Sequence, residues 1–323
     1  MPEYVDALND APRLLMQVPL QPLQGSRFQP TGFPDLGAAV YQTAEGQQLL
    51  VESAQSMANR LEAVCWDDAR NDVIEPLDGI SWVRVERNGE FLTGSILEAH
   101  RLNSPYILSD EDFESTLEEE TGAGEEMPLD FQQIAKVLLK YDCNCLLHGV
   151  FLVTLDGRMN CPRSLSSFIE ASGVRVATSG GVKKDHIDAT GGREAREAEG
   201  RRRGSEEGFG HVPYSREEYT ADEITAYFNL DLAQIRAFGL SDAAQQLLAT
   251  MALYKVRRFL SEGLRLRTAC DLDTAGEVVV QRPDGWELPD MHTLEQQLPD
   301  LIAAVTEEGL FADPPVTTVT FED

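Results

Sequence analysis

Apolar and polar residues alternate along several short segments of this 323-residue chain. Because successive side chains of a strand point to opposite faces, such alternation predicts β-strands with one buried face. The Glu45-Gly46 pair predicts a turn between residues 38–41 and 47–51. Asn88-Gly89 predicts a hairpin between residues 82–86 and 91–96. Alternation is the signal at residues 264–269 and 316–321, and further strands are expected at 38–41, 47–51, 82–86, 91–96 and 277–281.

A helical period replaces the alternation in other parts of the chain. After Glu52, apolar residues recur at Met57, Leu61 and Val64, which predicts an amphipathic helix. Further helices are expected after the capping residue Asp130, over residues 231–238, from Ser241 or Asp242 onward, and after a Thr293-x-x-Gln296 capping box. In the long helix from residue 241, Lys255, Arg257 and Arg258 are expected on a face away from the apolar stripe.

The middle of the chain shows helices and strands in alternation. Residues 146–155 are apolar enough to predict a central strand, and Ser164 is expected to cap a short helix that ends at Gly173. Residues 174–177 predict the next strand, and Thr220-x-x-Glu223 predicts a capping box for a helix towards Phe228. This order is compatible with an α+β fold whose open sheet is ferredoxin-like or similar to an RNA-recognition motif.

Three segments lack a clear period. Residues 1–26 predict an extended arm or short helix over the core, and residues 98–128 predict an acidic, solvated insertion. Residues 178–213 are rich in Gly, Arg and Glu and predict a second flexible insertion. We expect one elaborated domain over residues 1–323, with residues 274–323 as a C-terminal extension.

The charge of the chain argues against nucleic acid at first sight. The formal net charge is −28, whereas phosphate backbones attract basic proteins. Residues 110–130 alone hold ten carboxylates and no Lys or Arg. Screening over about 8 Å at physiological salt allows a separate basic surface to act locally. A saline habitat explains the acidic balance equally well.

Compartment and cofactor signals are few. The N-terminal residues have no basic region followed by an apolar core, and residues 146–153 are too short to cross a bilayer, so we expect a cytoplasmic protein. The odd number of cysteines, five, predicts reduced thiols. One cluster invites a zinc hypothesis, but its spacing matches no zinc motif, and we expect core thiols and neither metal nor cofactor. Its members are Cys143, Cys145, His148 and Cys161.

A polar segment around a Gly-Pro turn provides the first candidate site. Backbone amides at the start of a helix, together with side-chain amides and a guanidinium, are groups that hold phosphate oxygens. The alternative is a local network of turn and capping hydrogen bonds. The candidate residues are Arg27, Gln29, Thr31, Gly32, Ser53, Gln55, Ser56, Asn59 and Arg60.

Two further groups of basic residues are candidates for phosphate contacts. Lys183, Lys184 and His186 follow a pair of glycines that lets the backbone approach a nucleic-acid strand closely. The alternative for this group is a solvated charged loop. Arg163 and Arg216 form the other group, and the alternative for them is pairing with nearby carboxylates.

Several uncommon strings, in order, resemble one protein family. Taken together, they resemble the backbone subunit of the type I-U (also called I-G) CRISPR surveillance complex, a member of the RAMP superfamily. The resemblance covers roughly residues 10–275. The strings are RFQPTGFPDLGAA at 27–39, LLVESAQSMANRLE at 49–62, LLHGVFL at 146–152, RSLSSFIEASGVRV at 163–176, SGGVKKDH at 179–186, GFGHVPYSREEYTADEITAYFNLDLAQIR at 208–236 and RRFLSEGLRLRTACDLD at 257–273.

The resemblance implies a core like an RNA-recognition motif, or RAMP core, with large flexible insertions and a role in coating CRISPR RNA. The implied partners are CRISPR RNA, the target DNA strand paired to it, further copies of the chain, the large subunit and the guide-processing RAMP subunit. The family is thought to hold guide RNA by its backbone. The paired sheet aromatics of a standard RNA-recognition motif are missing from the sequence pattern, with Phe151 and Tyr214 as weak candidates for stacking on bases.

Two other functions are kept as alternatives. The first is a metal-dependent RNA endonuclease that uses Asp35 with His148 or His186, because related RAMP subunits resemble nucleases through a loop aspartate. In the I-U family the backbone subunit is not expected to cut, so we expect Asp35 to cap its turn. The second is an acidic scaffold that binds only other proteins.

Overall fold

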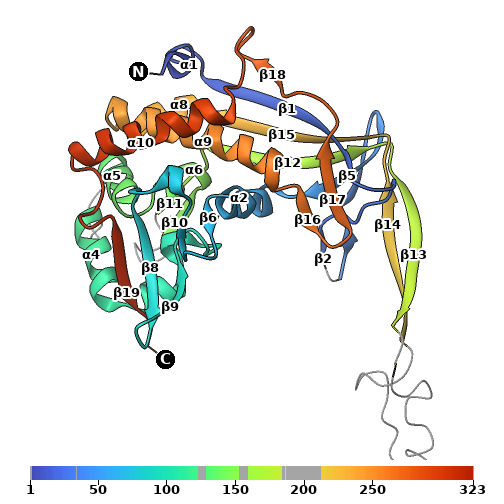
Figure 1. Ribbon diagram of the computed structural model, residues 1–323, viewed down its shortest axis with the longest axis horizontal. Helices are drawn as coiled ribbons and strands as arrows, with labels where there is room; N and C mark the ends of the chain where they lie inside the picture. The colour runs from blue at the N-terminus through green and yellow to red at the C-terminus, as the bar shows by residue number, and fades with distance from the viewer. Residues whose placement is uncertain are drawn as a thin grey trace, which may run out of the picture.

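The computed structural model describes residues 2–33, 35–122, 129–152, 159–183, 186 and 212–322. In Figure 1 the chain forms an arch: a long sheet spans the top, a lobe hangs from one end and a two-stranded ribbon from the other.

The helical elements within these residues are the following. They are α1 (Glu3–Asp6), α2 (Ala54–Ala63), η1 (Glu75–Leu77), η2 (Arg101–Asn103), α3 (Pro105–Leu108), α4 (Glu111–Thr121), α5 (Phe131–Tyr141), α6 (Asn144–His148), α8 (Leu232–Ala237), α9 (Asp242–Glu262) and α10 (Met291–Glu307).

The strands alternate with these helices along the chain. They are β1 (Arg13–Pro22), β2 (Gly32–Phe33), β3 (Gly37–Ala38), β4 (Val40–Thr43), β5 (Gly46–Glu52), β6 (Trp66–Asp67), β7 (Asp72–Val73), β8 (Trp82–Arg87), β9 (Glu90–Gly94), β10 (Val150–Leu152), β11 (Met159–Cys161), β12 (Leu165–Ser172), β13 (Arg175–Lys183), β14 (Val212–Thr220), β15 (Glu223–Asp231), β16 (Arg265–Arg267), β17 (Cys270–Thr274), β18 (Val279–Arg282) and β19 (Val316–Thr320).

The central sheet has the strand order β16-β17-β1-β15-β12-β5-β4, and β18 also pairs with β1. The neighbouring strands in this order pair in antiparallel fashion. The chain enters α2 between β1 and β12, and it enters α9 between β15 and β17. The result is a curved antiparallel sheet in a mixed α+β fold.

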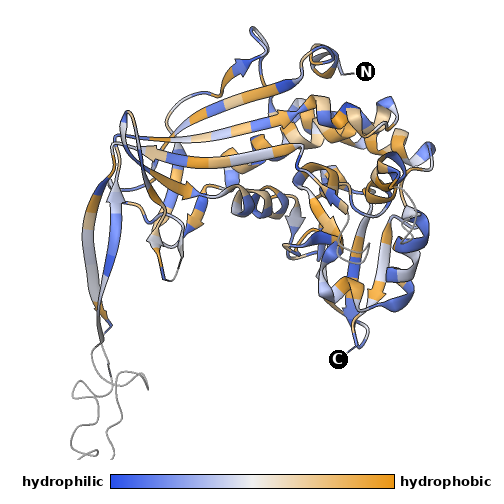
Figure 2. Ribbon diagram, turned by 180° about the vertical axis from the view of Figure 1, so that it is seen from behind, coloured by the Kyte–Doolittle hydropathy of each residue, from blue (hydrophilic) through white to orange (hydrophobic). Residues whose placement is uncertain are grey.

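One face of this sheet is buried under helices. Along β12 and β15 every second residue is buried, as in the series Leu165, Ser167 and Ile169. In Figure 2 apolar and polar residues alternate along the long strands. Helix α2 packs against β12 and α9 packs against β15, so the buried residues face these two helices.

The lobe at one end of the arch contains a second, smaller sheet. Strand β8 lies between β9 and β19, antiparallel to β9 and parallel to β19. Trp82 of β8 packs edge-on against Trp66, with ring centroids 5.2 Å apart. Helices α4 and α5 also belong to this lobe, so the last strand of the chain completes a structure begun by residues 66–94 (Figure 1).

The ribbon at the other end consists of β13 and β14. These nine-residue strands pair from Arg175 with Thr220 to Lys183 with Val212. In Figure 1 the ribbon projects away from the sheet and helices. The predicted flexible segment 178–213 therefore begins and ends as strand, and most of its interior lies outside the described residues.

Two predicted helices are strands. Residues 165–172 form β12 and residues 223–231 form β15, both in the middle of the central sheet. Leu165, Phe168 and Ile169 match a helical period by coincidence, while the alternation of burial along β12 has a period of two. The capping-box pattern at Thr220 fails because tertiary pairing with β1 and β12 overrides the local signal.

Three other local predictions are wrong. Residues 146–152, the described part of the segment predicted as a central strand at 146–155, do not form one: residues 144–148 form α6, and β10 pairs with β11 in a separate sheet. Residues 101–121 are not an irregular solvated stretch, because they form η2, α3 and α4, with Phe113 and Leu117 in the core. Residues 13–22 form a central strand and not an arm.

The remaining predicted elements are confirmed. These are the hairpins around Glu45-Gly46 and Asn88-Gly89, the helices starting near Glu52, Asp130, Asp231 and Ser241, and the final strand. The helix near residue 293 is present, but Asp290 is its capping residue. Among the described residues, none of the helices combines the length and apolar character needed to cross a bilayer.

Candidate nucleic-acid interface

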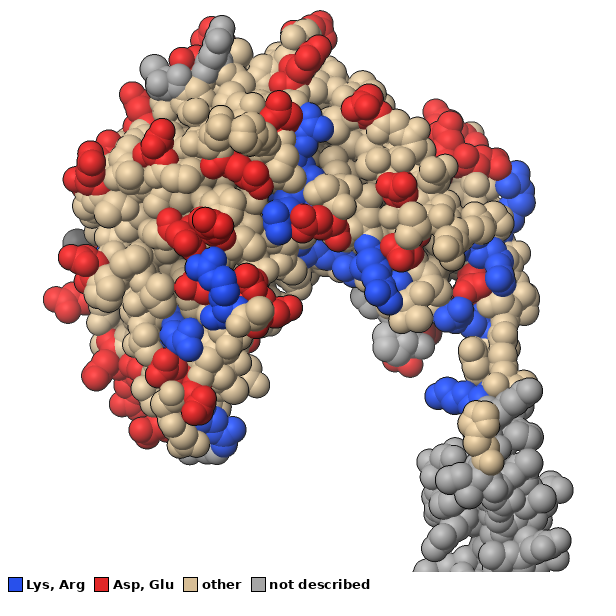
Figure 3. Space-filling view, viewed as in Figure 1, with Lys and Arg blue, Asp and Glu red and all other residues tan. Residues whose placement is uncertain are grey.

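Lys and Arg side chains gather on the underside of the arch. Figure 3 shows them below α2, around β16 and β17 and on the β13–β14 ribbon, whereas Asp and Glu crowd the outer surface of the lobe. The net charge of −28 is therefore unevenly distributed. A strand of nucleic acid in this concavity would meet a basic surface while the acidic faces point elsewhere.

The start of α2 forms the roof of this concavity. Ser53 caps the helix by accepting a hydrogen bond from the Ser56 amide at 3.3 Å. The Ser56 hydroxyl donates to the Glu52 carboxylate, and Gln55 and Asn59 are exposed. The capping alternative is thus correct for Ser53 and Ser56, while Gln55 and Asn59 remain accessible to a ligand.

Arg60 is held by internal partners. Its Nε atom lies 3.0 Å from the Glu52 carboxylate, and its terminal nitrogen donates to the Leu266 carbonyl. Glu52 is fully buried and is also paired with Arg267, which further donates to the Gln29 carbonyl at 2.9 Å. These contacts tie α2 to β5 and β16. Arg60 is therefore engaged by internal partners while its side chain is 25 % exposed, and its contact with phosphate stays a prediction.

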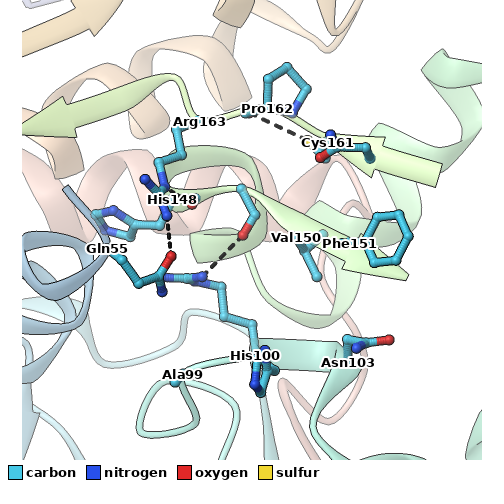
Figure 4. A pocket seen from close by; sticks show the side chains of 13 residues that line it. Gln55, Ala99, His100, Asn103, His148, Val150, Phe151, Cys161, Pro162 and Arg163 are labelled. Atoms are coloured by element: carbon cyan, nitrogen blue, oxygen red, sulfur yellow. Dashed lines mark hydrogen bonds between the residues drawn. The ribbon is translucent and has the colours of Figure 1, made fainter. Parts of the chain in front are cut away.

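Arg163 and Gln55 come together from distant parts of the chain. The guanidinium of Arg163 donates to the Gln55 side-chain oxygen, and its Nε atom donates to the His148 carbonyl at 3.0 Å. Both residues line a cavity of about 830 Å³ (Figure 4). Partial burial lowers the pKa of Arg163 from its usual value, but a guanidinium stays charged at neutral pH.

Arg27 and Arg216 share one carboxylate at the base of the ribbon. Arg27 lies 3.2 Å from Glu218, and Arg216 contacts the other oxygen of the same side chain. Glu218 is buried, whereas the Arg27 side chain is 56 % exposed. The alternative of pairing with a nearby carboxylate is correct for Arg216, yet the trio keeps one net positive charge and Arg27 remains accessible.

The segment that follows Arg27 is fixed by its backbone. Gln29 donates its amide to the Ala269 carbonyl and Thr31 donates its amide to the Val51 carbonyl, at 2.8 and 2.9 Å. The side chains of Gln29 and Thr31 are half-buried, and Gly32 begins the small β2–β3 hairpin. The turn of this hairpin includes Asp35, which is exposed. These two backbone hydrogen bonds hold the segment in place at the edge of the concavity.

The second predicted group lies at the tip of the ribbon. Lys183 is the last residue of β13 and is exposed, and His186 is also exposed. Lys184 lies outside the described residues. Lys183 and Arg216 are on opposite strands of one ribbon, which links the second and third predicted groups in space.

A buried ionic network supports α2 from behind. Arg101 of η2 grips Glu62 of α2 with two contacts of 2.6 Å, and it donates to the Gly149 carbonyl at 3.1 Å. Burial raises the pKa of the Glu62 carboxyl to about 7, although Arg101 opposes this effect. The pair thus connects α2 to η2 in the lobe and to Gly149, the residue before β10.

Lys255 extends the network into α9. Its ammonium group contacts the Asn144 side-chain oxygen and lies 2.9 Å from Nε2 of His148. Burial and the neighbouring Lys255 hold the pKa of His148 well below its usual value. The prediction that Lys255 lies on an outer face is wrong because Lys255 is fully buried. His148 is equally buried, and its Nε2 atom faces Lys255.

The zinc hypothesis gains no support. Cys143, Cys145 and Cys161 are buried free thiols, and burial raises the pKa of each. In the part of the chain that the structure describes, no group of three or more His, Cys, Asp or Glu side chains is arranged to hold a metal ion.

The structure also reveals residues that the sequence pattern did not identify. Phe168 of β12 and Tyr227 of β15 lie directly opposite each other and stack with centroids 5.0 Å apart. The sheet therefore carries an aromatic pair on the face away from α2 and α9. The pair was missed because both segments were predicted to be helices. Had residues 165–172 and 223–231 been predicted as strands, their alternation would have placed both rings on one face of the sheet.

The fold and the site together define a mixed α+β protein with a basic concavity. The chain belongs to the family described as CRISPR-associated protein GSU0053 (Cas_GSU0053), whose family model matches residues 14–176. No curated protein matches the chain.

Solved structures with likeness to this chain include two chains from structures titled "CRISPR RNA-guided surveillance complex, pre-nicking" and "CRISPR RNA-guided surveillance complex". The first has 14 % identity and a TM-score of 0.41 and covers 81 % of this chain and 74 % of that chain. The second has 11 % identity and a TM-score of 0.37, with 92 % and 83 % covered. The crystal structure of Thermofilum pendens Csc2 has 10 % identity and a TM-score of 0.33, with 95 % and 80 % covered.

Proposed function

We propose that this chain is a non-catalytic, RNA-binding backbone subunit that polymerises along CRISPR RNA and presents it for pairing with invading DNA. The observation that carries the proposal is the basic underside of the arch in a CRISPR-associated chain whose net charge is −28 (Figure 3). Such local concentration of Lys and Arg is the electrostatic footprint of a nucleic-acid site.

The strand order supports the RAMP part of the proposal. Strands β17-β1-β15-β12 are antiparallel neighbours, with α2 before β12 and α9 before β17. The order of these elements matches the one expected of a ferredoxin-like β-α-β-β-α-β core with β4, β5 and β16 as added strands, which supports the proposal. We infer that this core is the RNA-recognition-motif-like unit that the family resemblance implies.

The chemistry of the concavity suits RNA of any sequence. It offers the exposed cations of Arg27 and Lys183 and exposed amides at Gln55 and Asn59. Such groups contact phosphate and sugar and carry no base information. A guide-binding subunit requires this property, because specificity belongs to base pairing between guide and target. The further partners of the proposed assembly are the large subunit and the guide-processing subunit of a surveillance complex.

The test is assembly on RNA. Because the proposed role is to coat RNA, copies of the chain should associate head to tail, with their number set by RNA length. Light scattering of the purified protein with a guide-length RNA should give a multimer whose mass grows with a longer RNA. A strict 1:1 complex at every RNA length would contradict the proposal.

Incubation with divalent metal tests the non-catalytic part. Labelled RNA bound to the protein should stay intact with Mg²⁺ or Mn²⁺ present. Metal-dependent cleavage that co-purifies with the protein and is lost on substitution of one of its own residues would favour the endonuclease alternative.

A further inference from the structure

The cavity lined by Gln55 and Arg163 has two chemically different ends. Its volume of about 830 Å³ lies within the range of small-molecule sites. Figure 4 shows the Gln55–Arg163 pair on one side of the cavity and Phe151 on the other. One end offers a guanidinium and the other offers an aromatic ring. A nucleotide matches both ends, because its phosphate is charged and its base is flat and aromatic.

The β10–β11 ribbon places Phe151 where the core does not need it. Phe151 is 48 % exposed, while its neighbours on β10, Val150 and Leu152, are buried. Asn160 is the direct partner of Phe151 across the ribbon and is also exposed. Side chains of directly paired residues share one face of a ribbon. The ribbon thus presents an aromatic ring and an amide side by side to the cavity.

The hydrogen-bonding capacity of these groups is not used up internally. Among the described residues, the Asn160 amide has no protein hydrogen-bond partner. Arg163 spends Nε and one terminal nitrogen on His148 and Gln55, which leaves its other terminal nitrogen available. The amide therefore remains free for a base edge, and the guanidinium retains a donor for a phosphate.

We propose that this cavity takes one nucleobase of the bound RNA strand, stacked on Phe151 with its edge hydrogen-bonded to Asn160. The inference rests on the proposed function, because it requires a single strand in the concavity. Arg163 holds the phosphate of the same nucleotide. One nucleotide is then bound through its base, whereas the surrounding strand is held by its backbone. Stacking tolerates every base because each has a π-face, and the amide edge adds a preference.

The experiment uses the full chain and a short single-stranded RNA in which one base at a time is replaced by 2-aminopurine, whose fluorescence reports stacking. One position should show a fluorescence change on binding. Phe151→Ala should abolish that change and weaken binding by about 5- to 150-fold, and Phe151→Tyr should preserve both. Phe131→Ala is the matched control, because Phe131 is an exposed phenylalanine that does not line the cavity.

An RNA that lacks the base at the responding position tests the site without altering the protein. It should lose as much affinity as Phe151→Ala does, and the two changes together should cost no more than either alone. If RNA binds but no position responds and the abasic RNA binds equally well, the inference is overturned while the proposed function stands. If no RNA binds to the wild-type chain, the proposed function fails and the inference fails with it.

Discussion

Replacing Glu62 should lower the free energy of unfolding more than replacing Arg101, although both changes break the same ion pair. The pair joins α2, which carries Gln55 and Asn59, to η2 in the lobe, and both side chains are almost fully buried. Glu62→Gln leaves the Arg101 guanidinium buried without its counter-charge. Arg101→Met leaves a carboxyl, which can escape the penalty by taking up a proton.

The magnitude follows from burial and from protonation. Removing one partner of a buried ion pair costs about 3–5 kcal/mol, and Glu62→Gln should lie in this range. Burial already raises the pKa of Glu62 to about 7 against the opposing effect of Arg101. Without Arg101 that pKa should rise further, so Glu62 is protonated at neutral pH and Arg101→Met should cost less. The Glu62→Gln, Arg101→Met double variant leaves no charge behind and should cost less than the two single variants added together.

Urea unfolding of the four proteins at pH 7, followed by circular dichroism, measures this cycle. The cost of the double variant should fall at least about 2 kcal/mol below the sum of the single costs, since residues in direct contact couple by up to about 3 kcal/mol. If the single costs add to within about 0.5 kcal/mol, the two groups are independent and the argument from burial is refuted.

Three further predictions concern RNA contacts and pH. Lys183→Ala with Lys184→Ala should lower the slope of log affinity against log salt by about 1.4 if both residues contact phosphate, equally for unrelated RNA sequences; a larger effect from replacing residues 201–203 would place the RNA elsewhere. Asp35→Asn should cost little RNA affinity and leave any RNA degradation unchanged, because Asp35 is an exposed turn residue and an amide suits such a turn as well as a carboxylate does; loss of a metal-dependent activity would contradict this. The pKa of buried His148 lies well below its unfolded value of about 6.5, so its contribution to stability is complete above that pH and falls by about 1.4 kcal/mol per pH unit below it. Glu62 opposes this fall, because its raised pKa of about 7 makes the folded state take up a proton over the same range. The His148 contribution is therefore the difference in slope between unfolding curves of the wild type and of His148→Gln, measured from about pH 7 to about pH 5.5.

Strong local signals predicted much of the fold correctly. Asp130 caps its helix as expected, and Ser53, Asp231 and Ser241 cap the helices predicted to begin beside them, because a capping side chain bonds to backbone amides two or three residues away. The hairpin at Asn88-Gly89 is equally local. Such elements depend on neighbours in sequence, which the sequence alone provides.

Elements that depend on distant partners were mispredicted. Strand β15 lies between β1 and β12, and its pairing with both overrides the capping pattern at Thr220. Lys255 was expected on a surface, but its hydrogen-bond partners Asn144 and His148 come from another helix more than a hundred residues away. No short-range pattern contains such information.

In the candidate site, too, the sequence indicated the residue types but not the contacts between distant residues. Its residue types were predicted, since Arg163, Lys183 and the polar residues of α2 were all identified. Their relations were not: Arg163 bonds to Gln55, and Arg60 is engaged by Glu52. The exposure of Phe151 depends on β10 pairing with β11 at the rim of a cavity, which an apolar run of residues does not reveal.

The position of β1 in the central sheet constrains the order in which the protein can fold. Strand β1 is made first, but its sheet partners β15, β17 and β18 are made only in the last third of the chain. The family-matched residues 14–176 contain β1 and β12 yet lack β15, which separates them. Strand β8 likewise waits for β19. Such distant pairings slow folding, because long loops must close before the contacts form. During synthesis on the ribosome, the central sheet therefore keeps an open edge until β15 has been translated, and the sheet of the lobe keeps one until β19 has been translated.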